Sequence, residues 1–320
     1  MPAPVLVTGA TGFVGRSLCR LLVERGIPCR AAIRIPLAAP DLPTPVQSVV
    51  TGDIGPATDW SEALTEVEAV VHLAARVHHL KDDQPGLYRQ VNTLGTLHLA
   101  GQAARAGVRR FVFLSSVKAV GESGHLTPDT PPTPADAYGR SKREAELGLR
   151  DLEARTGMEV VILRPPLVYG PGVRANFLRL LRLIDRGVPL PLASVDNRRS
   201  LLYVDNLADA ILTCLAHPAA AGQTFYVSDG EPLSTPALIR HLAHALGRPA
   251  RLVPFPPVLL RLAARLLGRG ALADRLLGDL TVDDLPLRRT LTWTPPCSIE
   301  EGMARTARWY MQPGRPSGPF

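Results

Sequence analysis

The stretch VLVTGATGFVG, residues 5–15, decides the fold of this 320-residue chain. A short apolar run leads directly into three glycines, which open a helical pattern. Glycines at this place allow a tight turn, a close approach of the backbone to a pyrophosphate, and close packing of the helix on the strand. The amides at the start of such a helix favour an anion. We therefore expect a dinucleotide site here, with contacts from Gly9, Thr11, Gly12, Phe13, Val14 and Gly15.

Short β-type runs alternate with helical patterns through the first half of the chain. The expected strands are 4–9, 29–34, 46–53, 69–75, 110–116 and 159–166, and the expected helices are 12–25, 61–67 with Ser61 as cap, 86–106 and 138–155. Such alternation is typical of a Rossmann-type α/β fold, a doubly wound parallel sheet.

The pattern changes after about residue 167, where prolines become frequent and helices are expected at 178–187, 234–247, 257–268 and 298–311. The segment 200–228 reads as strand, helix and strand, and is expected to return to the first sheet. We therefore predict a Rossmann domain of residues 1–170 plus about 200–228. A smaller, mostly helical substrate domain would comprise about 171–199 plus 229–312, followed by a frayed tail at 313–320.

Composition excludes several classes of protein. The net charge is +7, from 36 basic and 29 acidic residues, but the basic residues form no cluster typical of a nucleic-acid interface. Apolar runs end well before the ~20 residues that a membrane span needs. The four cysteines are scattered, so neither a metal site nor a disulfide framework is expected. Because the N-terminus lacks the features of a signal peptide, we expect a cytoplasmic protein.

The segment YGRSK, residues 138–142, places Tyr138 four residues before Lys142 in a chain with only three lysines. Residues with this spacing lie on one helix face. A free phenol titrates near pH ~10, and a neighbouring ammonium favours the phenolate. Ser115 and Ser116 end the strand at 110–116, at the edge where open α/β sheets bind ligands. We predict a catalytic unit in which Tyr138 is the acid/base and a serine positions the substrate oxygen.

The strand at 29–34 ends in Arg34 and not in the acid that would favour NAD. A guanidinium there suits the 2′-phosphate of NADP, which favours NADP over NAD. The alternative, that Arg34 stacks on the adenine or points to solvent, stays open.

With these motifs the chain resembles the extended short-chain dehydrogenases/reductases, specifically the family of nucleotide-sugar epimerases, dehydratases and reductases. The matching segments cover nearly the whole chain and include TGATGFVG (8–15), GDI (52–54), HLAA (72–75), VNTLGT (91–96), SSVKAVGE (115–122), YGRSK (138–142), RPPLVYGPG (164–172) and SLLYVDNLADA (200–210). The resemblance implies Ser116, Tyr138 and Lys142 as catalytic residues, with Ser115 as a support. It also implies further cofactor contacts from Asp53, Ile54, Leu73, Ala74, Ala75, Asn92 and Pro165, besides Tyr138 and Lys142.

The same resemblance implies a UDP-sugar bound in the C-terminal domain, and a homodimer formed through the helices near 86–106 and 138–155. The implied substrate contacts are Arg76, Ser116, Val117, Lys118, Asn176 and Arg199. Among these, Asn176 would bind the diphosphate and Arg199 a phosphate or the nucleotide ribose. A strand at 188–193 would border the base.

One departure from the family narrows the reaction. Its 4,6-dehydratases carry an Asp-Glu pair directly after the catalytic Ser/Thr, whereas this chain has Val117 and Lys118. Without these carboxylates an elimination of water lacks its proton carriers. We expect hydride and proton transfer at C4 of the sugar. A 4-keto-sugar reductase of surface-polysaccharide biosynthesis is placed first, and a 4-epimerase with tightly bound NAD is the alternative. A non-catalytic cofactor-sensing regulator is a minor alternative.

The segment VLLRLAARLLGRG, residues 258–270, is basic and amphipathic, as helices at membrane surfaces are. The expectation is a helix that lies on the substrate domain with its arginines outward, and a membrane-surface role is the alternative.

Overall fold

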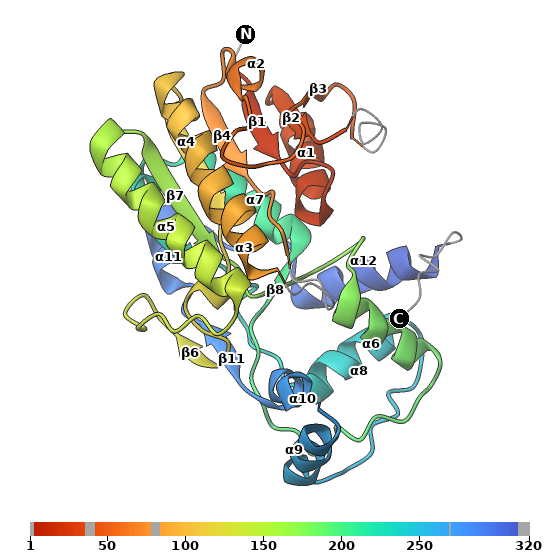
Figure 1. Cartoon of the computed structure of the whole chain (residues 1–320). Helices are drawn as coiled ribbons and strands as arrows, with labels where there is room; N and C mark the ends of the chain where they lie inside the picture. Colours follow the sequence, from red (N-terminus) through yellow and green to blue (C-terminus); the bar gives the residue numbers. More distant parts are fainter. Residues whose placement is uncertain (1–2, 36–41, 78–83, 269, 313–320) are drawn as a thin grey trace.

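The central sheet of the protein has seven strands in the order β10-β7-β5-β4-β1-β2-β3, and all neighbours are parallel (Figure 1). The computed structural model describes residues 3–35, 42–77, 84–268 and 270–312, and the expected tail at 313–320 lies outside them. The strands are β1 (Val5–Thr8), β2 (Cys29–Ile33), β3 (Gln47–Val50), β4 (Ala69–His72), β5 (Arg110–Leu114), β7 (Glu159–Arg164) and β10 (Thr224–Tyr226). The predicted doubly wound parallel sheet is confirmed. The strand order reverses between β1 and β4, which is where such sheets bind ligands.

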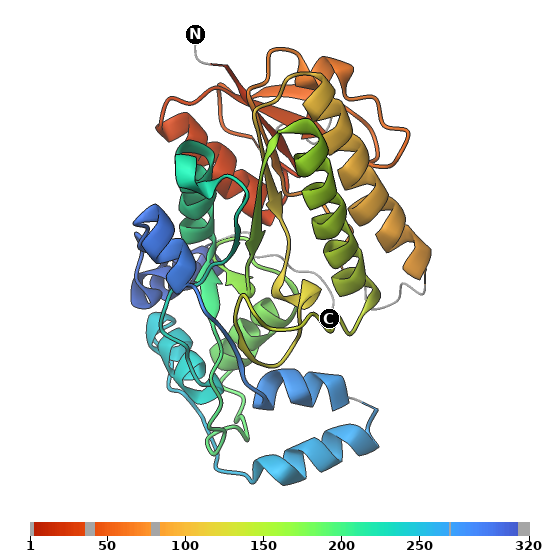
Figure 2. The ribbon, with the colours of Figure 1, turned by 90° about the vertical axis from the view of Figure 1, so that its left-hand side faces the viewer.

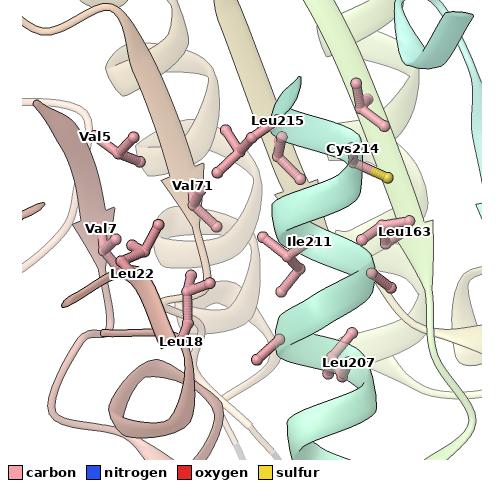
Figure 3. Packing of buried hydrophobic residues seen from close by; sticks show 14 of the residues in the cluster. Val5, Val7, Leu18, Leu22, Val71, Leu163, Leu207, Ile211, Cys214 and Leu215 are labelled. Carbon is pink, nitrogen blue, oxygen red and sulfur yellow. The ribbon is translucent and has the colours of Figure 1, made fainter. Parts of the chain in front are cut away.

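Helices cover both faces of this sheet. One face carries α1 (Phe13–Glu24) and α7 (Val204–Ala216), and the other carries α2 (Ser61–Leu64), α4 (Thr96–Arg105) and α5 (Ala137–Thr156). Figure 3 shows α1 and α7 packed on the first face, where apolar side chains of both helices meet those of β1, β4 and β7. The labelled residues are Val5, Val7, Leu18, Leu22, Val71, Leu163, Leu207, Ile211, Cys214 and Leu215.

A smaller part follows below the carboxyl edge of the sheet. Its apolar core joins α6 (Ala175–Asp185), α8 (Thr235–Ala245) and α12 (Ile299–Met311) to the strand pair β8 (Leu167–Tyr169) and β9 (Leu201–Tyr203). The remaining elements are β6 (Gly124–Leu126), β11 (Leu280–Val282), α9 (Pro257–Leu266), α10 (Gly270–Leu277), α11 (Leu285–Leu291), η3 (Val117–Ala119) and η4 (Pro218–Ala220). The sequence did not predict the paired strands β6 and β11, because each of them has only three residues.

The helix expected at 86–106 is divided into three parts, α3 (Pro85–Tyr88), the π-helix η2 (Arg89–Gly95) and α4. Helical segments of the π type are rare and occur frequently at functional sites. Here the π-helix contains Asn92, which the sequence predicts as a cofactor contact.

Three local expectations are wrong. No strand forms at 188–193, where Pro189 and Pro191 lack amide donors and only Leu190 bridges to Leu252. The helix α2 is shorter than predicted and is not capped by Ser61, whose amide and hydroxyl both donate to Asp59. The segment 200–228 is divided between two sheets, since β9 pairs with β8 and only β10 joins the central sheet at β7.

Candidate active site

The glycine loop between β1 and α1 is held against the end of β4. Gly9 has a φ of +69°, and a Cβ atom there would lie 2.8 Å from the amide nitrogen of Ala74. A Cβ atom at Gly15 would overlap the carbonyl oxygen of Gly9, so only glycine lets α1 begin directly on the loop. No side chain caps the first turn of α1, whose N-cap is Gly12. These features fit a dinucleotide, whose pyrophosphate would take the place of the missing cap.

The end of β4 is tied to its neighbours by a buried histidine. Thr8 Oγ1 lies 2.7 Å from His72 Nδ1, and His72 Nε2 lies 2.9 Å from Thr96 Oγ1. Because Thr96 donates to the carbonyl oxygen of Asn92, it accepts from Nε2, and Thr8 then donates to Nδ1. Burial, and then the charge of Lys142, lower the pKa of His72 to about 3, so the ring is neutral. The following residues Leu73–Ala75, predicted cofactor contacts, are thereby positioned beside the glycine loop.

The predicted catalytic side chains come together at the carboxyl end of β5. Tyr138 lies in the first turn of α5, and its side chain is hydrogen-bonded to Ser116. Lys142, one turn later, is buried. Its Nζ donates to the carbonyl oxygen of Leu114 at 2.8 Å and lies 4.5 Å from the ring centroid of Phe113. The three side chains thus meet at one edge of the sheet, two strands from the glycine loop.

The pKa of Tyr138 differs from the expectation. Burial raises the pKa of Tyr138 to about 12, although the hydrogen bond with Ser116 lowers it and the charge of Asp136 raises it further. Burial also lowers the pKa of Lys142 to about 7, against the opposing effect of Glu146. The expectation that the pKa of Tyr138 is lowered is therefore wrong when only the protein's own groups act on the phenol. Loss of hydration exceeds the effect of the hydrogen bond with Ser116, and the ammonium of Lys142 is directed at the Leu114 carbonyl.

The depressed pKa of Lys142 predicts a specific pH dependence of stability. The pKa of about 7 in the folded chain lies below the unfolded value of ~10.4, so the unfolded chain binds more protons between these limits. The contribution of Lys142 to the free energy of unfolding should therefore rise by up to about 1.4 kcal/mol per pH unit from about pH 7 to about pH 10. Below about pH 7 Lys142 is charged in both the folded and the unfolded chain, so it adds no pH dependence to the free energy of unfolding.

Replacement of Lys142 by methionine should remove this slope. Denaturant unfolding of both proteins at several pH values gives the difference in free energy of unfolding. We expect Lys142→Met to be relatively more stable near neutral pH and to lose this advantage as the pH rises. A pH-independent difference between the two proteins would contradict the prediction.

The start of α5 is seated closely on the turn that carries Ser116. A Cβ atom at Gly139 would overlap the carbonyl oxygen of Lys118, so glycine is needed for this approach. Asp136 caps the helix by accepting from the amide of Gly139 at 2.7 Å. The Asp136 carboxylate also accepts from Nζ of Lys118 at 2.5 Å. These contacts set the distance between Tyr138 and Ser116, and sequence spacing alone did not reveal them.

A buried ion pair supports the same strand end from behind. The Glu146 carboxylate accepts from Ser115 Oγ at 2.6 Å and from two nitrogens of Arg164 at 2.9 and 2.7 Å. Arg164 in turn lies 5.5 Å from the ring centroid of Tyr226. Ser115 is thus a supporting residue by geometry. Glu146 was missed, although it follows Lys142 by four residues and so shares its helix face.

Three predicted contact residues are already engaged within the protein. Asn92 binds the backbone of Arg76 through both its amide oxygen and nitrogen, and donates to Ser141 as well. It positions the segment after β4 and has no donor left for a cofactor. The side chain of Val117 is buried in an apolar cluster with Leu126.

Lys118 is the third engaged residue. Its ammonium is paired with Asp136 and, at 3.0 Å, with Glu122. Lys118 therefore anchors the turn through two carboxylates, and its contact with the substrate stays a prediction.

The other predicted residues surround the site at greater distance. Arg34 directly follows β2, Asp53 lies in the segment after β3, and the two form an exposed pair at 3.7 Å. Ile54 is packed near Gly95. The carbonyl oxygen of Pro165 accepts from the amide of Val117. The remaining three are the other predicted substrate contacts. The guanidinium of Arg76 lies over the ring of Tyr88, Asn176 is exposed in the first turn of α6, and Arg199 donates to the Gly278 carbonyl at 3.0 Å.

The profile of the NAD dependent epimerase/dehydratase family matches residues 5–228. The chain belongs to this family. It is 43% identical over 322 residues to the UDP-glucose 4-epimerase of Vibrio cholerae, with 98% of this chain and 97% of that protein covered. It is also 30% identical over 263 residues to the N-acetyl-alpha-D-glucosaminyl-diphospho-ditrans,octacis-undecaprenol 4-epimerase of Escherichia coli O157:H7, which covers 79% and 76% of the two chains.

The fold of this epimerase/dehydratase family member agrees with that of solved structures. The UDP-glucuronic acid 4-epimerase of Bacillus cereus in complex with NAD has a TM-score of 0.78 at 22% identity, over 96% of this chain and 98% of that one. Family membership makes the protein an NAD(P)-dependent enzyme, and the alternative of a non-catalytic regulator is set aside.

Proposed function

We propose that this enzyme is a 4-epimerase of a UDP-hexose or UDP-N-acetylhexosamine that works through NAD. The observation that carries the proposal is the meeting of Tyr138, Ser116 and Lys142 at the sheet edge that also holds the glycine loop, two strands away. The similarity to a UDP-glucose 4-epimerase along nearly the whole chain supports it. The apolar Val117 and the neutralised Lys118, at the positions where dehydratases carry acids, argue against dehydration.

The residues present suggest how the proton moves. NAD, when bound, would supply an acceptor for the C4 hydride and then a donor of hydride to the opposite face of the keto-sugar. Ser116 donates a hydrogen bond to the C4 oxygen and orients it toward Tyr138. Tyr138 takes the hydroxyl proton as the C4–H bond breaks, and returns it to the oxygen of the keto-sugar. Lys142 stabilises the phenolate by its charge, which its pKa of about 7 leaves partly present at neutral pH.

A 4-keto-sugar reductase that uses NADPH is the second candidate, and Arg34 favours it. The guanidinium is 71% exposed at the end of β2, where a 2′-phosphate would lie. Its pairing with Asp53 is loose, at 3.7 Å, so a phosphate would compete for it. A reductase shares the roles of Ser116, Tyr138 and Lys142 and needs only one hydride transfer.

Incubation of the purified enzyme with candidate substrates distinguishes the two. Three substrates are offered with no added cofactor: UDP-glucose, UDP-N-acetylglucosamine, and N-acetylglucosaminyl diphospho-undecaprenol. Products are identified by NMR. Formation of the C4 epimer under these conditions is the expected result. Stoichiometric oxidation of NADPH with a UDP-4-keto-sugar, without epimerisation, would assign the reductase instead. Absence of both reactions would contradict an activity at C4.

A further inference from the structure

The helix α9 turns most of its leucines away from the protein. None of its ten residues, all within the described part of the chain, is buried. The expected arrangement, with the apolar face on the substrate domain, is wrong, because only Leu260 and Ala264 contact the small cluster formed with α10. The outward residues and their exposed fractions are Val258 71%, Leu259 49%, Leu262 55%, Leu266 80% and Leu267 73%. An apolar face of this size is unusual on a protein that stays free in water.

The exposed face is held firmly at one end of the molecule. Figures 1 and 2 show α9 and α10 as a helical hairpin at the end farthest from β3. The base of the hairpin is anchored by Asn197, whose Nδ2 donates to the carbonyl oxygens of Leu276 and Gly278 at 3.2 and 3.1 Å. Thr235 donates to Leu276 as well, and Arg261 of α9 donates to Leu277. The outward direction of the leucines is therefore built into the fold.

The sequence around this face is rich in arginine. Residues 232–273 contain no aspartate or glutamate and include six arginines, Arg240, Arg248, Arg251, Arg261, Arg265 and Arg269. Phe255 and Val253, just before α9, are also exposed, at 39% and 44%. Apolar side chains beside a basic rim characterise helices that lie in the interface of an anionic bilayer. In the described part of the chain no helix is long and apolar enough to cross a membrane, so the contact would be superficial.

We propose that α9 and the preceding segment, residues 253–267, dock on an anionic membrane surface, with the leucines among the lipid headgroups and the arginines on the lipid phosphates. The hairpin ends at Gly278, whose carbonyl oxygen accepts from Arg199. Docking would therefore hold Arg199, which is predicted to contact a phosphate of the substrate, close to the bilayer.

Co-sedimentation of the full chain with vesicles tests the proposal. We expect binding to phosphatidylglycerol-containing vesicles at low salt, with much weaker binding to pure phosphatidylcholine and a loss at high salt. The double variant Leu262→Glu/Leu266→Glu should bind at least about tenfold more weakly. Arg265→Gln should weaken binding by about fivefold. The control Leu285→Glu/Met311→Glu places the same charges at exposed apolar positions outside α9, which are 50% and 45% exposed, and should bind like the unaltered chain.

Three outcomes would overturn the proposal. These are absence of binding at low salt, equal loss of binding in both double variants, and a dimer in sedimentation velocity that Leu262→Glu/Leu266→Glu dissociates, since a second copy would then cover the face. Turnover of a water-dissolved UDP-sugar is measured on the same variants. Unchanged turnover shows that the variants are folded, and keeps a failure of docking separate from a failure of the proposed function.

Discussion

Replacing Tyr138 with phenylalanine should lower kcat by about 1000-fold, while the protein stays folded and retains its cofactor. The change removes only the phenolic oxygen, which is the proton carrier to the sugar oxygen. General acid–base catalysis by a positioned side chain contributes factors of roughly 100 to 10,000. The tyrosine ring stays in the first turn of α5, so its packing is kept.

Steady-state turnover of the substrate identified by NMR provides the measurement. Cofactor retained by the purified variant is determined from its absorbance after denaturation. Tyr310→Phe is the matched control, because it removes a hydroxyl that contacts Asp185 in α6, far along the chain from the proposed catalytic residues. Its kcat should remain close to that of the unaltered enzyme. Near-normal turnover in Tyr138→Phe would show that another group carries the proton.

Replacing Arg164 with methionine should lower the free energy of unfolding by about 3–5 kcal/mol. The change leaves the Glu146 carboxylate, which is 2% exposed, without the two hydrogen bonds from its main partner. Arg143 lies 3.1 Å away but its side chain is 29% exposed, so it replaces Arg164 only in part. A buried charge that loses its partner costs far more than the pair contributes in total.

The double variant Arg164→Met/Glu146→Leu should recover much of this loss, because it removes both charges together. Denaturant unfolding of the single and double variants measures the difference. Arg155→Met is the control, since it breaks an exposed ion pair with Asp151 on the same helix, where an effect below about 1 kcal/mol is expected. A double variant less stable than Arg164→Met would mean that packing, and not an uncompensated charge, dominates.

The sequence predicted those parts of the site that depend on neighbours in the chain. Gly9 and Gly15 are both needed where the loop after β1 enters α1. Tyr138 and Lys142 share one face of one helix. The alternation of strands and helices likewise predicted the parallel sheet, because a right-handed connection between parallel strands leaves few other arrangements. Local spacing carries this information, so residue types and intervals were enough.

Only the tertiary structure decided which residues support these side chains and what pKa values they have. Glu146, Arg164 and Ser115 come from three different elements, and no interval in the sequence relates them. The pKa of Tyr138 rises because burial depends on atoms from the whole fold, although the sequence placed a lysine beside it. The direction of the α9 leucines also required the structure. An amphipathic pattern shows that a helix has an apolar face, but only packing against α10 determines that this face points outward.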